Sequence, residues 1–191
     1  MAHTPVHGIP MIEEDDASPE IAEIYAEIKH DLQSPYVPNW AKATAPSPVA
    51  LKMYMGIRRE FHKYLTLPES LVAMILYTVA KKTNCVYCAA TNELECRTLG
   101  VDEQTLDAIA NDLQKIEPER TRSIVEFALT SATDPQSLGA EDFDKLRGYG
   151  ITDEEILEIG MVAAMAVFND VLADTFKVEV DPEVTDALSP K

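Results

Sequence analysis

Two cysteines at C-x-x-C spacing are the residues of this sequence best suited to chemistry. Cys85 and Cys88 lie in the stretch NCVYCAATNE, at the predicted start of a helix. With Asn84 as the helix cap, Cys85 is predicted to be the first helical residue, and Cys88 follows one turn later on the same side. Unpaired N–H groups and the positive end of the helix dipole favour thiolate over thiol there. The spacing therefore favours a redox pair that attacks a peroxide or a disulfide and then closes a disulfide of its own.

Two other interpretations of the pair stay open at this point. Structural zinc normally takes four ligands, and the third cysteine, Cys96, follows Cys88 by about 12 Å along a helix axis. The histidines are scattered without ligand spacing, at His3, His7, His30 and His62. Zinc is therefore disfavoured, and no metal or other cofactor is expected. The remaining interpretation is that the cysteines only pack in the core, as Cys96 is expected to do.

The composition of the chain excludes several classes of function. The 191 residues carry a formal net charge of −17, whereas a nucleic-acid footprint needs clustered Lys and Arg. The acidic residues are dispersed apart from one cluster at residues 13–16, which indicates a solvated surface. No apolar run approaches the roughly 18 residues of a membrane span, and the N-terminus lacks the pattern of a secretory signal. We therefore expect a cytoplasmic protein that binds neither nucleic acid nor membrane.

Helical patterns surround the cysteine pair on both sides, and strand patterns are nearly absent. Caps, proline starts, glycine stops and apolar residues at helical spacing predict a series of helices. They cover residues 19–32, 48–61, 69–82, 85–99, 102–113, 118–130, 141–147 and 152–176. The helix at 69–82 is apolar on all sides and is expected to be central. The predicted fold is a single all-α domain over 1–191, with a core at about 47–130 and a C-terminal helical extension at about 140–180.

The sequence also resembles the alkylhydroperoxidase D-like, or carboxymuconolactone decarboxylase, family, especially its peroxidase-related branch. The resemblance runs through LPESLVAMILYTVAKKTNCVYCAATNELECRTLG and GITDEEILEIGMVAAMAVFNDVLADTFKVEVDPE, and it spans nearly the whole chain. It implies an all-helical homo-oligomer. It further implies that the second cysteine, Cys88, attacks the hydroperoxide and that Cys85 resolves the product, whereas the dipole argument alone favours Cys85 as the nucleophile.

The sequence departs from this family at the two positions of its proton relay. The family's glutamate and histidine correspond to Ala73 and Asn92, and neither side chain can act as a general base near neutral pH. Possible substitutes are Glu69, on the same helical face as Ala73, Asn92 itself through a bound water, and Tyr87 between the cysteines. Ordinary helix-start and packing roles are the alternatives for Glu69 and Tyr87.

The predicted function is a weak, thiol-dependent, peroxidase-related oxidoreductase that acts through Cys88 and Cys85 on a hydroperoxide or a disulfide. An external thiol or dithiol is the expected reductant, because the sequence has no glycine loop for a nucleotide. The main alternative is a non-catalytic or redox-sensing helical oligomer with the same fold. Carbon-acid chemistry, as in the decarboxylase members, is a third possibility with little support, since no histidine lies in the matching motif.

Overall fold

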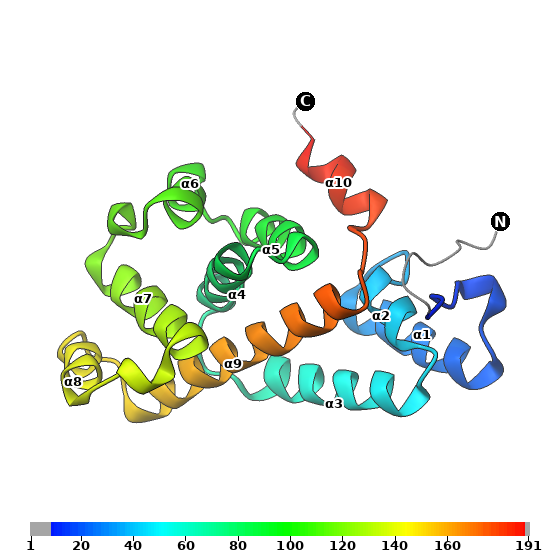
Figure 1. Cartoon of the computed structure of the whole chain (residues 1–191), viewed down its shortest axis with the longest axis horizontal. Coiled ribbons are helices and arrows are strands. Elements are labelled where there is room, and N and C mark those ends of the chain that lie inside the picture. The colour runs from blue at the N-terminus through cyan, green and yellow to red at the C-terminus, as the bar shows by residue number, and fades with distance from the viewer. Residues whose placement is uncertain (1–8, 190–191) are drawn as a thin grey trace. The chain divides into compact units, whose positions relative to one another are not determined.

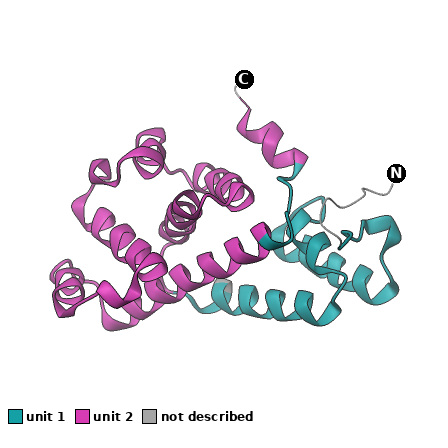
Figure 2. Ribbon diagram, in the orientation of Figure 1, with its two compact units in different colours: residues 1–65, 175–181 teal, residues 66–174, 182–191 magenta. Residues whose placement is uncertain are grey.

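The computed structural model describes residues 9–189, and every regular element in this range is a helix (Figure 1). The all-α prediction is confirmed for this part of the chain. The helices form two compact units, one of residues 1–65 and 175–181 and the other of residues 66–174 and 182–191 (Figure 2). The cysteine pair lies in the second unit.

The first unit is held together by an apolar core between three helices. They are α1 (Pro19–Leu32), α2 (Asn39–Thr44) and α3 (Pro48–Tyr64), preceded by the short helix η1 (Glu14–Asp16). Ser18 and Ser47 cap α1 and α3, each accepting a backbone N–H with its side chain, as the Ser-Pro pairs predict. The core includes Ile28, Val37 and Leu51, all fully buried.

A buried aspartate fastens the return segment of this unit to α2. Asp181 is 2% exposed and accepts the backbone N–H of Asn39 at 2.7 Å. The Asn39 side chain donates in turn to the carbonyl of Glu179 at 3.0 Å. Since α2 begins after a proline that offers no side-chain cap, Asp181 supplies the missing acceptor at the helix start.

The second unit is built around α4 (Glu69–Thr83), which packs against α5 (Val86–Thr98), α6 (Glu103–Asn111) and α7 (Glu119–Thr133). The remaining elements of the unit are η2 (Leu113–Lys115), η3 (Pro135–Ser137), α8 (Ala140–Gly148), α9 (Asp153–Thr175) and α10 (Pro182–Leu188). The central position expected for the helix at 69–82 is thus observed. The helix α10, which packs against α5, lies beyond the helices predicted from the sequence.

Polar side chains of α9 contact both ends of α4. Glu158 accepts the backbone N–H groups of Thr66 and Leu67, just ahead of α4, at 3.0 and 3.2 Å. About three turns further along α9, Asp170 accepts the hydroxyl of Thr83, the last residue of α4, at 2.7 Å. These two contacts hold α9 so that Asp170 faces the C-terminal end of α4, directly ahead of the cysteines.

The apolar composition of α9 bears on the expectation that the protein binds no membrane. Among the described helices, α9 alone is long and apolar enough to cross a bilayer, and 39% of its apolar window is buried. Core helices of soluble proteins meet the same criteria of length and composition. Its exposed side includes Leu157, Met161 and Val171.

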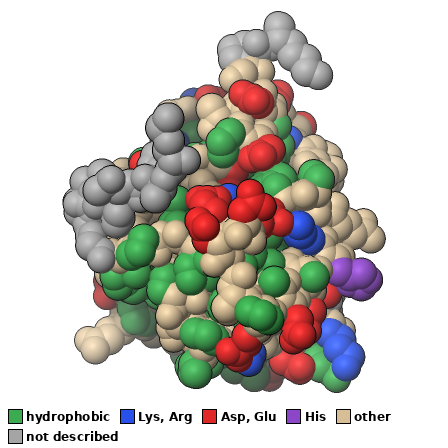
Figure 3. All heavy atoms as spheres, turned by 90° about the vertical axis from the view of Figure 1, so that its right-hand side faces the viewer, with side chains coloured by type: hydrophobic (Ala, Val, Ile, Leu, Met, Phe, Trp, Pro, Cys, Tyr) green, Lys and Arg blue, Asp and Glu red, His purple; other side chains and the backbone are tan. Residues whose placement is uncertain are grey.

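The charge of the described surface follows the sequence. Asp and Glu side chains are spread over the face seen in Figure 3 among apolar and neutral groups, with few Lys or Arg between them. Several basic residues are paired with acidic ones, as Lys52 is with Glu20 at 2.6 Å. This distribution fits the solvated acidic surface that the composition predicts.

Candidate functional site

The cysteine pair sits at a sharp junction between α4 and α5. Asn84 adopts the left-handed conformation, with φ of 63°, and ends α4; asparagine is one of the few residues that tolerate it. Cys85 then occupies the N-cap of α5, and its Sγ accepts the backbone N–H of Cys88 at 3.3 Å. The prediction that Asn84 caps this helix and that Cys85 is its first residue is therefore wrong by one position.

Asp170 of α9 completes a three-residue cluster with the two cysteines. The two sulfurs and a carboxylate oxygen of Asp170 all lie within 4.8 Å of one another. All three residues are buried: Cys85 is 0%, Cys88 5% and Asp170 4% exposed. Both thiols act on the carboxyl group of Asp170 and favour its ionised form. We refer to Cys85, Cys88 and Asp170 as the thiol–carboxylate cluster.

Burial dominates the electrostatics of Asp170. It raises the pKa of this carboxyl group, because the charged form loses its hydration. The hydrogen bond from Thr83 and the two neighbouring thiols act in the opposite direction and favour the carboxylate, while the negative charge of Asp174 raises the pKa of Asp170 further. Asp170 therefore binds a proton more readily than an exposed aspartate does.

The environment of Cys88 differs from the one that the helix start alone predicts. The pKa of the Cys88 thiol is raised well above its ordinary value, first by its hydrogen bond with Cys85, then by burial, and then by the charge of Asp170. The expectation that the helix dipole makes this sulfur a thiolate does not hold, since these three effects outweigh it. Cys88 rests as a thiol.

The predicted substitutes for the missing relay are distributed as follows. Glu69 is exposed at the first turn of α4, about 21 Å of helix axis from Thr83, so the structure does not bring it to the cluster. Asn92 is half-buried on α5, one turn beyond Cys88. Tyr87 directly precedes Cys88 on the same helix and is buried. Ala73 is buried in an apolar core cluster.

The third cysteine belongs to that core cluster and not to the site. Cys96 is fully buried near Ala73 and Tyr77, and burial raises the pKa of its thiol to about 12. This is the packing role that the sequence analysis expected for it.

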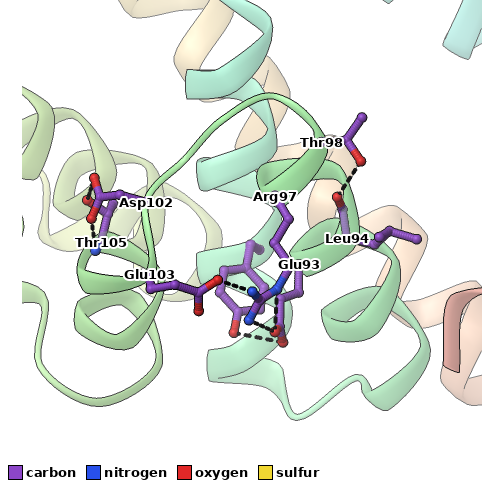
Figure 4. A network of polar contacts seen from close by, with 8 residues as sticks. Glu93, Leu94, Arg97, Thr98, Asp102, Glu103 and Thr105 are labelled. Carbon is purple, nitrogen blue, oxygen red and sulfur yellow. Dashed lines mark hydrogen bonds and ion pairs between the residues drawn. The ribbon is translucent and has the colours of Figure 1, made fainter. Parts of the chain in front are cut away.

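A polar network ties the far end of α5 to its neighbours (Figure 4). Arg97 lies between Glu93 on its own helix, at 2.9 Å, and Glu103 at the start of α6. Glu93 also accepts the hydroxyl of Tyr77 from α4 at 3.3 Å. These contacts join three helices of the second unit and so help to set the orientation of α5, whose first turn carries the cysteines.

The cluster also resembles part of a metal site. Two thiolates and one carboxylate are suitable ligands for zinc. Among residues 9–189, these three residues form the one group of potential metal ligands that lie close enough together to share an ion. Asp170 is a third potential ligand that the spacing of the cysteines and histidines does not reveal. Closed structural zinc sites take four. Of the histidines, His30 is exposed beside Asp31, and His3 and His7 lie outside the described residues.

Asp170 is the residue of this site that sequence reasoning missed. A signal for it exists within α9, where the buried residues recur at helical spacing. They are Ile156, Ile159, Val162, Ala163, Ala166, Asp170 and Ala173. A single carboxylate on an otherwise apolar stripe needs a polar partner, but the sequence does not show that the partners are the cysteines.

Comparison with known proteins identifies the fold. No protein-family model and no curated protein matches the chain. Among solved structures, an uncharacterised peroxidase-related protein with an alkylhydroperoxidase AhpD core, from Ralstonia eutropha JMP134, is similar with a TM-score of 0.85 and 22% identity over 99% of this chain and 100% of that one. An uncharacterised peroxidase-related protein from Silicibacter sp. TM1040 is similar with a TM-score of 0.80 and 20% identity, over 95% of this chain and 97% of that one. The debrominase Bmp8 is similar with a TM-score of 0.78 and 19% identity, over 95% of this chain and 96% of that one.

These similarities extend over nearly the full length of each chain. The resemblance drawn from the NCVYC motif and the C-terminal helix is thereby confirmed at the level of the fold. This chain has the all-helical, AhpD-like fold of the peroxidase-related proteins, and it carries a C-x-x-C pair at Cys85 and Cys88.

Proposed function

We propose that this protein is a thiol-dependent oxidoreductase that reduces a hydroperoxide through Cys88 and Cys85. The observation that carries the proposal is the thiol–carboxylate cluster, in which two sulfurs and a carboxylate oxygen lie within 4.8 Å. The two sulfurs lie within 4.8 Å of each other, so a short movement brings them to the roughly 2.05 Å of a disulfide bond. The AhpD-like fold supports the same chemistry.

The proposed reaction has two steps before reduction. The Cys88 sulfur attacks one oxygen of the hydroperoxide ROOH, the O–O bond breaks, and the products are a Cys88 sulfenic acid and the alcohol ROH. The Cys85 sulfur then attacks the sulfenic sulfur, forming the disulfide and releasing water. An external dithiol supplies two electrons and two protons to restore both thiols.

Accessibility and electrostatics favour different cysteines as the nucleophile. The Sγ of Cys85 accepts the backbone N–H of Cys88 at the helix start, where the argument from the helix dipole places the nucleophile. Cys88 retains 5% exposure, whereas Cys85 has none. We assign the attack to Cys88, as the family resemblance implies, because the attacking sulfur must meet the substrate.

The experiment is consumption of cumene hydroperoxide by the full-length protein with excess dithiothreitol. We expect Cys88→Ser to abolish turnover and Cys85→Ser to accumulate the Cys88 sulfenic acid, which dimedone traps for mass spectrometry. The matched control is Cys96→Ser, a buried thiol outside the cluster. Full activity of the Cys88→Ser variant would remove the proposed nucleophile.

The redox-sensing alternative rests on a specific observation, the raised pKa of Cys88. A thiol that rests protonated reacts slowly, so the pair could respond to oxidants without turning over. A slow, stoichiometric oxidation of the pair by peroxide with no dithiol-supported turnover would favour this alternative. Since a cysteine-to-alanine variant of the debrominase Bmp8 binds 2,3,4-tribromopyrrole, the same assay should include this compound as a second electrophile.

A further inference from the structure

The chemistry proposed for the cysteine pair lacks a proton acceptor at the positions where the resemblance places one. Ala73 lies in an apolar core cluster, and Asn92 carries no basic group. Cys88 nevertheless rests as a thiol, so its proton must leave before or during attack on a substrate. A group inside the site has to receive it.

Asp170 is the titratable group that the structure places beside both thiols. It comes from α9, 87 positions after Thr83, and Thr83 holds its Oδ2 at 2.7 Å. A carboxylate accepts hydrogen bonds at both oxygens, so the contact with Thr83 leaves acceptor capacity for the thiols. The carboxylate is 4% exposed, and bulk water therefore does not compete freely for the same contacts.

We propose that Asp170 transfers the protons of the Cys85–Cys88 pair, as a carboxylate supplied by α9 in place of the relay positions 73 and 92. This inference rests on the proposed function. A carboxylate oxygen of Asp170 lies within 4.8 Å of both reacting sulfurs, and Asp170 is the catalytic base in this scheme. Thr83 acts through Asp170 and is a positioning residue.

The proton steps balance over one cycle. The Asp170 carboxylate takes the proton of Cys88 as this sulfur attacks ROOH, and it returns that proton to the leaving RO⁻, which gives ROH. When the Cys85 sulfur attacks the sulfenic acid, Asp170 takes the Cys85 proton and delivers it to the departing hydroxide, which gives water. Asp170 ends the cycle ionised, as it began.

The surroundings of Asp170 suit this role. A base is most effective when its proton affinity approaches that of the group it deprotonates, and burial shifts Asp170 in that direction. The charged and titratable groups that act on it are Cys85 and Cys88 at the start of α5 and Asp174 one turn further along α9, while Thr83 contributes an uncharged donor.

Asp170→Asn separates a proton-transfer role from a purely electrostatic one. The variant removes a negative charge beside Cys88, so the thiol pKa, measured from the pH dependence of iodoacetamide alkylation, should fall. If Asp170 is the base, peroxidase kcat/KM should nevertheless drop by about 100-fold or more. A kcat/KM equal to or above that of the wild type would overturn the proposal, because loss of the charge alone makes Cys88 more reactive.

A second variant avoids changing the buried group. Asp174 is exposed, and its charge raises the pKa of Asp170, so Asp174→Asn should move the acid limb of the kcat/KM profile to lower pH. Glu154→Gln, an equal change of charge at an exposed position in the first turn of α9, is the matched control and should leave the profile in place. Identical profiles for wild type and Asp174→Asn would overturn the proposal.

Each assay is run with and without EDTA, since the cluster has three potential metal ligands. A wild-type rate that EDTA abolishes would also overturn the proposal, by assigning Asp170 to a metal. The outcomes separate the two claims: loss of turnover in Cys88→Ser with an unchanged Asp170→Asn variant refutes the role of Asp170 alone. A wild-type protein without turnover refutes the function as well.

Discussion

The contact between Thr83 and Asp170 gives the sharpest stability prediction, because it joins α9 to the end of α4 directly at the cysteine pair. Thr83→Val keeps the shape of the side chain and removes the hydroxyl that donates to Asp170 at 2.7 Å. A hydrogen bond to a charged group contributes about 1.5–3 kcal/mol. Since Thr83 is exposed while Asp170 is buried, water replaces part of the lost contact, and we expect a loss of about 1–2 kcal/mol in the free energy of unfolding.

The matched control is Thr98→Val. Thr98 is the last residue of α5, as Thr83 is of α4, and is likewise exposed. Its hydroxyl donates only to a backbone carbonyl of its own helix, that of Leu94 at 2.9 Å. Thr83 makes comparable contacts with Val79 and Ala80 in addition to its bond with Asp170. The control should therefore change the free energy of unfolding by less than about 0.5 kcal/mol.

The assay is urea unfolding followed by far-UV circular dichroism and by tryptophan fluorescence. Trp40, the one tryptophan of the chain, packs against the core of the first unit, so its fluorescence reports that unit separately. A loss of about 1–2 kcal/mol corresponds to a fall in Tm of roughly 2–8 °C for a chain of this size. The reasoning is refuted if Thr83→Val matches the Thr98 control, or if it destabilises equally in an Asp170→Ala background, where the contact no longer exists.

Three further predictions follow from the same structure. Because burial raises the pKa of Asp170 above the ordinary aspartate value of about 3.9, its contribution to stability is fully present below about pH 4 and is lost as pH rises through the folded-state pKa. The stability of Asp170→Asn relative to wild type should therefore increase with pH over that window, and a constant difference in urea titrations would contradict this. Asn84→Ala should lower the free energy of unfolding by about 1 kcal/mol, because φ at this position is 63°. Asn84→Gly should lower the free energy of unfolding by less, and equal Tm values for the two variants would argue against strain at the junction. Glu69→Ala should leave peroxidase kcat/KM unchanged, since Glu69 lies about 21 Å of helix axis from the end of α4 that adjoins the cysteines; a tenfold loss of kcat/KM would restore it as a relay candidate.

The cysteine pair shows how far local sequence signals reach. The C-x-x-C spacing, the glycine stop at Gly100 and the capping box of Thr152 with Glu155 act within a few residues, and the structure contains each of them. The error at Asn84 is also local. Asparagine is common both as a helix N-cap and as a left-handed C-cap, and the sequence does not decide which helix it serves.

The sequence by itself determined the helical architecture and the presence of two neighbouring thiols, because helix periodicity, caps and C-x-x-C spacing depend on contacts between residues three or four positions apart. Only the tertiary structure decided that a carboxylate joins these thiols. Asp170 reaches them across 87 positions of chain from Thr83, through the packing of α9 beside the end of α4. The raised pKa of the Cys88 thiol comes first from its hydrogen bond with Cys85, which is local in sequence, and then from burial and the charge of Asp170, which depend on tertiary packing.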